Sequence, residues 1–291
     1  MPPAPGLGTR SANKKYEKLR IRSGTNPDTS DGMPYFFRFL RSPSWHASKG
    51  GTMAGYFKRL YERTMREAYT LAEARIVAAL ADGGNALDCG AGSGHLANRL
   101  QIDTDRYHGI EWSNDATAQA QARGLKIVNG DLNLALPYPD AHFRCVFGLS
   151  VLEHLLRPCR YLRECHRVLE PGGQLVILTP NIATYFTAFL VLAGRMPSSG
   201  PHPDSDALIA STGPIERLTS HVAHDADNDT PSHRHLVIFS YLALQRYLRM
   251  LGFRDVAGSG FGVYPFPNAV QPLVERLDPY HAHQMVFVAR K

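Results

Sequence analysis

The sequence predicts an α/β fold of three layers, in which helices cover both faces of a mostly parallel sheet. Three observations predict it. Short apolar runs alternate with segments of helical spacing along most of the chain. The first of these runs ends in an acid and a glycine-rich turn. The chain has 291 residues, of which 44% are hydrophobic, which is enough for one such domain with additions.

The most informative segment is residues 86–94, which read Ala-Leu-Asp-Cys-Gly-Ala-Gly-Ser-Gly. An apolar run ends at Asp88, a tight turn contains Gly90, Gly92 and Gly94, and a helical segment follows. This order holds a nucleotide at the edge of a parallel sheet. The G-x-G-x-G spacing is neither the dinucleotide fingerprint nor a P-loop. An acid two residues before the first glycine suits a ligand with a cationic amine.

Further strands and helices alternate after this turn. The expected strands are residues 107–111, 126–129, 145–149, 174–178, a strand beginning with 253–256, and 285–289. Helical spacing predicts helices over residues 53–81 (one or two of them), 153–169 (either continuous or interrupted at Pro158) and 240–251. Glu111 ends the second strand, where an acid about 20 residues after the first can bind ribose hydroxyls.

These segments, across about residues 85–180, resemble the class I S-adenosylmethionine-dependent methyltransferases. The closest resemblance is to the branch with ubiquinone-biosynthesis, sugar and natural-product O-methyltransferases. Its marks are V-L-E-H at 151–154, L-x-P-G-G at 169–173 and Thr-Pro-Asn at 179–181. The resemblance implies a Rossmann-like sandwich with a seven-stranded sheet in the order 3-2-1-4-5-7-6, strand 7 being antiparallel.

The resemblance also implies the cofactor, S-adenosyl-L-methionine, and the residues that bind it. Glu111 would bind the ribose, and Asp131 would meet the adenine amino group. The full expected set is Asp88, Cys89, Gly90, Ala91, Gly92, Gly94, Glu111, Trp112, Asp131, Leu132 and Leu149.

Composition divides the chain into three parts. Residues 1–30 are expected to be a disordered basic tail, and residues 31–82 a helical N-terminal cap. Residues 83–291 are the expected methyltransferase domain, with a lid insertion at 181–235 that contains an apolar helix. Residues 1–70 hold 13 Lys and Arg against 5 Asp and Glu, and the rest holds 19 against 21, so the basic charge is N-terminal.

Methyl transfer to a hydroxyl benefits from a general base with a pKa near neutrality, and histidine fits this role. His154 follows the fourth strand and is the predicted base, although a histidine that only bonds to the backbone is an equally good interpretation. The other residues expected around the substrate and lid are Glu153, Asn181, His233 and His235.

No metal site is predicted from the sequence. Small-RNA 2′-O-methyltransferases carry E-x-x-E-H after strand 4 and a later histidine. Glu153 and His154 match the last two positions, but Ser150 replaces the first glutamate. Losing one of four ligands weakens a divalent site.

The predicted function is methyl transfer from S-adenosylmethionine to a hydroxyl of a small molecule, for example a sugar, a phenol, a polyketide or a quinone. An anionic or lipid-linked acceptor is one candidate. The alternatives are an RNA methyltransferase that uses the basic N-terminus and a catalytically silent cofactor-binding scaffold. No stable nucleic-acid binding and no transmembrane segment are expected. The four cysteines lack C-x-x-C spacing, which predicts free thiols and a cytoplasmic location.

Overall fold

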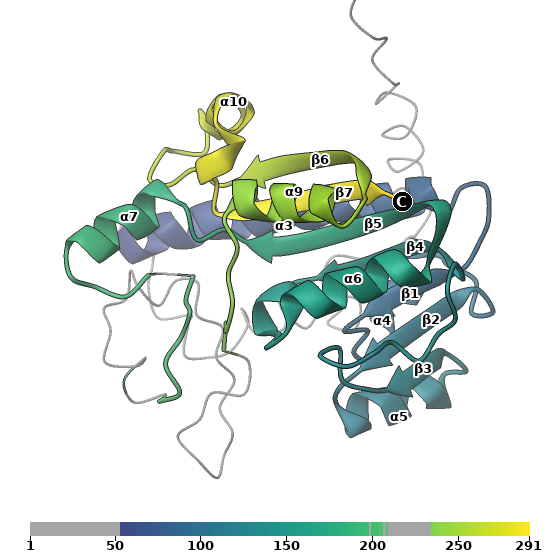
Figure 1. The fold of residues 1–291 in the computed structure, drawn as a ribbon. Coiled ribbons are helices and arrows are strands. Elements are labelled where there is room, and N and C mark those ends of the chain that lie inside the picture. The colour runs from purple at the N-terminus through teal and green to yellow at the C-terminus, as the bar shows by residue number, and fades with distance from the viewer. Residues whose placement is uncertain (1–52, 198, 206–207, 209–233) are drawn as a thin grey trace, which may run out of the picture.

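The structure is a computed structural model that describes residues 53–197, 199–205, 208 and 234–291. The expected tail at 1–30, the first part of the cap and His233 lie outside the described residues. Seven strands form one sheet in the order β3-β2-β1-β4-β5-β7-β6 (Figure 1), which confirms the predicted order. The strands are β1 (Ala86–Cys89), β2 (Tyr107–Glu111), β3 (Lys126–Asn129), β4 (Phe143–Leu149), β5 (Leu169–Pro180), β6 (Arg254–Phe261) and β7 (Gln284–Arg290).

The first five strands pair in parallel, and β7 runs antiparallel to β5 and β6. Parallel strands with helical crossovers bury both faces of a sheet, which is why their sequences read as nearly continuous apolar runs. The carboxyl ends of β1 to β5 therefore lie along one edge, with β1 and β4 as neighbours.

Helices cover both faces. They are α3 (Met53–Ala79), α4 (His95–Leu100), α5 (Asn114–Ala122), α6 (Pro158–Val168), α7 (Tyr185–Leu192), α9 (Tyr241–Met250) and α10 (Gln271–Leu277), with short 3-10 turns η2 (Leu152–His154) and η4 (Pro279–His281). Helices α6 and α9 share one core with the sheet, and α3, α4 and α5 share the other. Side chains of β5 alternate between the two cores, because successive residues of a strand point to opposite faces.

Helix α3 is one continuous helix of 27 residues, which settles the choice between one helix and two over residues 53–81. Its side chains Ala68, Ala72 and Ile76, which recur at helical spacing, are fully buried against the sheet. Helix α9 agrees with the prediction, since the Ser240 hydroxyl caps it by accepting from the Ala243 N–H at 3.3 Å. Small side chains on α3 allow its axis to approach the strands closely.

The helix predicted over 153–169 is interrupted at Pro158, which is the second of the two expected arrangements. Leu152–His154 forms a separate 3-10 turn, and α6 begins only at Pro158. Proline favours the first turn of a helix because it has no N–H to leave unpaired and its φ is already helical. Leu169, expected in the helix, instead begins β5. The break leaves Glu153 and His154 on a turn at the carboxyl edge of the sheet.

The insertion after β5 begins with α7 and returns to the body at residue 234. Its two ends run beside each other, since the Ile182 N–H donates to the Phe239 carbonyl at 3.1 Å. The returning segment is also bonded to η2, where the Glu153 carbonyl accepts from the Leu236 N–H at 2.7 Å. This connection places the end of the insertion over the turn after β4.

Candidate active site

The turn between β1 and α4 lines a cavity at the carboxyl edge of the sheet. Its lining residues are Tyr69, Asp88, Gly90, Ala91, Gly92, Ser93, His95, Leu96, Arg99 and Leu149. Strand order reverses between β1 and β4, because β2 and β3 lie on one side of β1 and β5 on the other side of β4. Such a switch point is where open α/β sheets bind their ligands.

Two glycines of this turn are needed for different reasons. Gly90 has φ +80°, and a Cβ there would stand 2.7 Å from Cγ2 of Val151. Gly92 has φ +54°, and a Cβ there would meet nothing within 4 Å. Both positions require the left-handed region that glycine adopts at little cost. Gly92 therefore presents bare backbone to open space, which leaves room for a ligand.

Asp88 ends β1 inside the cavity and is buried, with 4% of its surface exposed. Its carboxylate accepts a short hydrogen bond from the hydroxyl of Tyr107 on β2. Burial, opposed by the Tyr107 hydrogen bond and by Arg99 and aided by the charge of Glu111, raises the pKa of Asp88 to about 7. A buried acid with one hydrogen-bond donor is well suited to a cationic group of a ligand.

Glu111 closes the glycine turn from the neighbouring strand. Its Oε2 accepts from the Gly92 N–H at 2.7 Å, and its Oε1 accepts from the Ser113 N–H at 2.8 Å. The acid predicted to bind ribose hydroxyls thus lies against the glycine loop. Its two backbone donors hold the carboxylate in one orientation.

Of the remaining predicted cofactor residues, Ala91 and Leu149 line this cavity, and the others lie outside its lining. Trp112 follows β2 and is 74% exposed. Asp131 follows β3, and its Oδ1 accepts from the Asn133 N–H at 2.8 Å. Leu132 is buried in the core beneath them. Cys89 is also buried in that core, so its side chain points away from the cavity and only its backbone borders the loop.

Five lining residues were missed by the sequence analysis, namely Tyr69, Ser93, His95, Leu96 and Arg99. Those from Ser93 to Arg99 follow directly from the glycine loop and could have been found there. Tyr69 comes from α3, and its hydroxyl donates to the Ser150 Oγ at 3.2 Å. Nothing in the periodicity of α3 indicates which of its turns faces the loop.

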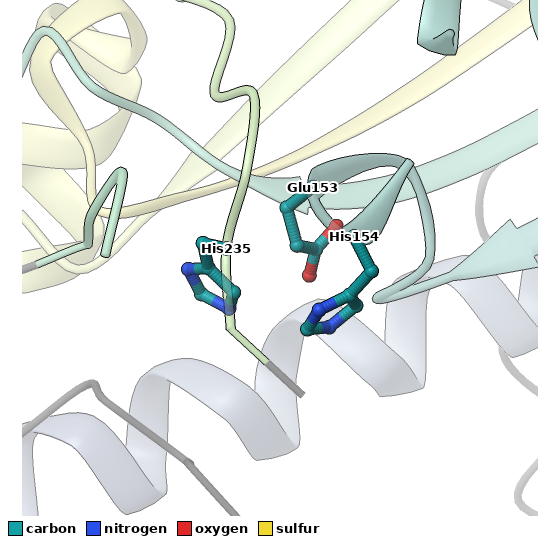
Figure 2. A group of neighbouring side chains, drawn as sticks. All are labelled: Glu153, His154 and His235. Carbon is teal, nitrogen blue, oxygen red and sulfur yellow. The ribbon is translucent and has the colours of Figure 1, made fainter. Parts of the chain in front are cut away.

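Three side chains meet beside this cavity, at the turn after β4. Figure 2 shows Glu153 and His154 on that turn and His235 on the returning segment of the insertion, with their side chains directed toward one another. Each offers one atom that could bind a metal, and these three atoms lie within 4.8 Å of one another. The rings of His154 and His235 are 5.0 Å apart. The structure thus brings together three of the residues expected around the substrate and lid.

Backbone carbonyls orient both imidazoles. Nδ1 of His154 donates to the Arg234 carbonyl at 3.1 Å, and Nδ1 of His235 donates to the Ser199 carbonyl at 2.6 Å. The unprotonated nitrogen of each neutral ring is then Nε2. Burial lowers the pKa of His235 to about 4, so that its ring is neutral at pH 7. The Glu153 carboxylate is buried and accepts from the Thr179 hydroxyl at 2.9 Å.

Asn181, expected around the substrate and lid, makes hydrogen bonds that join parts of the fold. It is fully buried, and its Nδ2 donates to the carbonyls of Tyr280 and Ala282 at 2.7 and 2.8 Å. Its Oδ1 accepts from the N–H groups of Ala183 and Tyr241 at 3.0 and 3.3 Å. All hydrogen-bonding positions of the amide are therefore used to join the start of the insertion to α9 and η4.

Comparison with known proteins supports a methyltransferase function for the segment that forms this edge of the sheet. Residues 87–177 match the family model described as "Methyltransferase domain". This range covers β1 to β5 and therefore includes both the glycine loop and the turn that carries Glu153 and His154.

Three curated relatives each match over about a third of this chain. A probable S-adenosylmethionine-dependent methyltransferase of Mycolicibacterium smegmatis is 35% identical over 35% of this chain and 40% of its own length. The 27-O-demethylrifamycin SV methyltransferase of Amycolatopsis mediterranei is 33% identical over 39% of this chain and 46% of its own. The ubiquinone biosynthesis O-methyltransferase of Pseudomonas syringae is 32% identical over 34% and 45%. The matches span less than half the length of these relatives.

Proposed function

Because residues 87–177 are a class I S-adenosylmethionine-dependent methyltransferase domain, we propose that the chain transfers a methyl group to a hydroxyl of a small-molecule acceptor. One observation carries the proposal. The glycine loop after β1 and the Glu153–His154 turn after β4 lie on adjacent strands, at the same edge of the sheet. A site for the methyl donor therefore borders a cluster that can position an acceptor.

The residues of the glycine loop fit S-adenosylmethionine. Gly92 leaves its Cβ position open, and the buried carboxyl of Asp88 can face the cationic amine of the methionine part. Glu111 and Asp131 follow the next strands in the order that suits ribose and adenine. When bound, the cofactor supplies an electrophilic methyl group, and the carbon–sulfur electron pair stays on sulfur as the new bond to oxygen forms.

The residues of the chain must align the acceptor oxygen with the methyl group and allow the removal of the hydroxyl proton. Glu153, His154 and His235 form a group of described titratable residues beside the glycine loop, and the ring of His202 contacts that of His235. The role of His154 as general base, predicted from the sequence, stays a prediction. Because His235 lies beside His154, the experiments should vary the whole cluster and not His154 alone.

The acceptor is proposed to have an apolar part. Helix α7 begins the insertion and exposes Phe189 and Leu192, with 66% and 88% of their surfaces accessible. Such side chains suit a phenolic, polyketide or lipid-linked acceptor. Two relatives named for O-methylation act, by their names, on a rifamycin and in ubiquinone biosynthesis, which supports this chemical class. No described helix is both long and apolar enough to span a membrane.

The proposal is tested by incubating the full chain with methyl-labelled S-adenosylmethionine and a panel of phenols, sugars and polyketides. Label is expected in the ether methyl of at least one acceptor, located by mass spectrometry. Structured RNA belongs in the same panel, because label in RNA would favour the alternative acceptor. Cofactor binding with no transfer to any acceptor would favour the silent scaffold.

A further inference from the structure

We propose that Glu153, His154 and His235 bind one divalent transition-metal ion, to which the acceptor hydroxyl binds. The inference rests on the proposed function and specifies how the acceptor's proton is handled. It also changes the role of His154 from the predicted general base to a metal ligand.

The donor set and its spacing favour such an ion. Two imidazoles and one carboxylate each direct one ligand atom into a region less than 4.8 Å across. Imidazole nitrogens suit ions such as Zn²⁺, Mn²⁺, Fe²⁺ and Co²⁺, whereas Mg²⁺ and Ca²⁺ prefer oxygen ligands. Ligand atoms around a bound Zn²⁺ are about 3.3 Å apart, since each lies about 2.0 to 2.1 Å from the ion. Small side-chain rotations would bring these three to that spacing.

The hydrogen bonds around the cluster are those of a metal site. A ligating histidine usually donates its other ring N–H to a carbonyl or carboxylate, which fixes the ring and its tautomer. His154 does so to Arg234 and His235 to Ser199. The third member, Glu153, is held by the Thr179 hydroxyl. All three side chains thus have an outer partner that orients them.

Backbone hydrogen bonds also hold His235, the member of the cluster that is distant in the sequence, in place. The carbonyl of Glu153 accepts from the Leu236 and Val237 N–H groups at 2.7 and 3.3 Å. The His235 N–H donates to Nδ1 of His202 at 3.1 Å. His235 is therefore tied to the very turn that carries the other two side chains, although 81 positions separate it from His154.

Three protein ligands leave positions on the ion for an acceptor. A hydroxyl that binds there has a lowered pKa and releases its proton to water. The oxygen lone pair then forms the bond to the methyl carbon, the carbon–sulfur bond breaks, and its electron pair remains on sulfur. The balance is one proton released for each methyl group transferred.

The test begins with the full chain after chelation and dialysis. Titration calorimetry with Zn²⁺ and with Mn²⁺ is expected to give one ion per chain. His235→Ala and the isosteric Glu153→Gln should each weaken binding at least tenfold. His166→Ala, a matched control at a histidine on α6 outside the cluster, should bind as the wild type does. Circular dichroism and the response to S-adenosylhomocysteine show whether each variant is folded.

The outcomes separate this inference from the proposed function. No ion bound by the wild type, or equal binding by folded Glu153→Gln, overturns the metal site. Full methyl transfer by the chelated protein also overturns it and leaves the proposed function intact. Loss of transfer on chelation, with restoration by Zn²⁺ or Mn²⁺ and unchanged binding of S-adenosylhomocysteine, supports it. Metal binding with no methyl transfer to any acceptor would leave the site standing and contradict the proposed function.

Discussion

At the scale of single residues, the site depends on polar groups buried in exact places. Among the described side chains, Tyr107 donates a hydrogen bond to Asp88, which is buried at the end of β1. An acid in this environment is costly to ionise without a cation. This free-energy cost of ionisation fits a site in which a cationic ligand binds next to Asp88.

Asp88 makes a prediction about pH. Its pKa of about 7 lies above the ordinary value of 3.8, so the folded protein keeps a proton that the unfolded chain loses between these values. Stability without cofactor should therefore fall as pH rises across this window, by about 3 kcal/mol between pH 5 and 8. Asp88→Asn removes the titrating carboxyl and with it this pH dependence. The neighbouring Tyr107, Glu111 and Arg99 are present in both proteins, so their effects cancel in the comparison.

The measurement is urea unfolding of the wild type and of Asp88→Asn at several pH values. The difference between their unfolding free energies should move steadily in favour of the variant as pH rises. A difference that does not change with pH would mean that Asp88 is ionised at neutral pH in the folded protein.

His154 makes a second prediction at this scale. His154→Ala should lower kcat by roughly 10²-fold or more, because either a proton acceptor or a metal ligand is lost. Affinity for S-adenosylhomocysteine should stay nearly unchanged, since His154 is outside the cofactor cavity. Calorimetry and steady-state kinetics check the two parts, with His166→Ala as control. Full activity would remove His154 from the mechanism.

At the scale of elements, α3 connects the fold to the site. It packs small buried side chains on the sheet and brings Tyr69 to the cavity. The sequence could predict that α3 is amphipathic, because that depends on spacing alone. It could not predict which turn meets the glycine loop, because that depends on how the whole helix is placed on the sheet.

The packing of α3 can be tested with two identical changes on one helix. Ala72→Leu inserts a large side chain at a fully buried position and should cost about 1–3 kcal/mol of unfolding free energy. Ala78→Leu, at an exposed position of α3, should change it by less than about 0.5 kcal/mol. Urea denaturation of both variants is the measurement. Equal effects would show that α3 does not lie on the sheet as described.

The 3-10 turn after β4 shows another limit of prediction from sequence. The spacing of apolar residues from 153 to 169 resembles one helix, but Pro158 begins α6 and leaves η2 separate. Pro158 was the residue at which the sequence allowed an interruption, since proline favours a helix start over a helix interior, but the spacing alone did not decide between the two arrangements. The consequence is functional, because η2 aims Glu153 and His154 at the returning segment.

At the scale of the whole molecule, the order of the strands separates two groups of site residues. The residues expected to bind the cofactor lie at the ends of β1, β2 and β3, and Glu153 and His154 follow β4, on the other side of the switch point. The glycine spacing, the acids at strand ends and the family resemblance were enough to place the first group at one edge of the sheet, and its binding of the cofactor stays a prediction. The meeting of His235 with Glu153 depends on the path of the insertion, which has no local signal in the sequence. Asn181, expected around the substrate and lid, uses its whole amide in hydrogen bonds within the fold, and no signal in the sequence indicated these partners.

The central claim is that the glycine loop holds S-adenosylmethionine, and cofactor binding tests it most directly. The measurement is the thermal unfolding of the full chain with and without S-adenosylhomocysteine, beside Gly90→Ala, whose Cβ would strike Val151. Ligand at about 100 times its Kd should add roughly 2.7 kcal/mol to the wild type and shift its Tm upward, with little or no shift for a folded Gly90→Ala. No shift of the wild type at millimolar ligand would contradict the account.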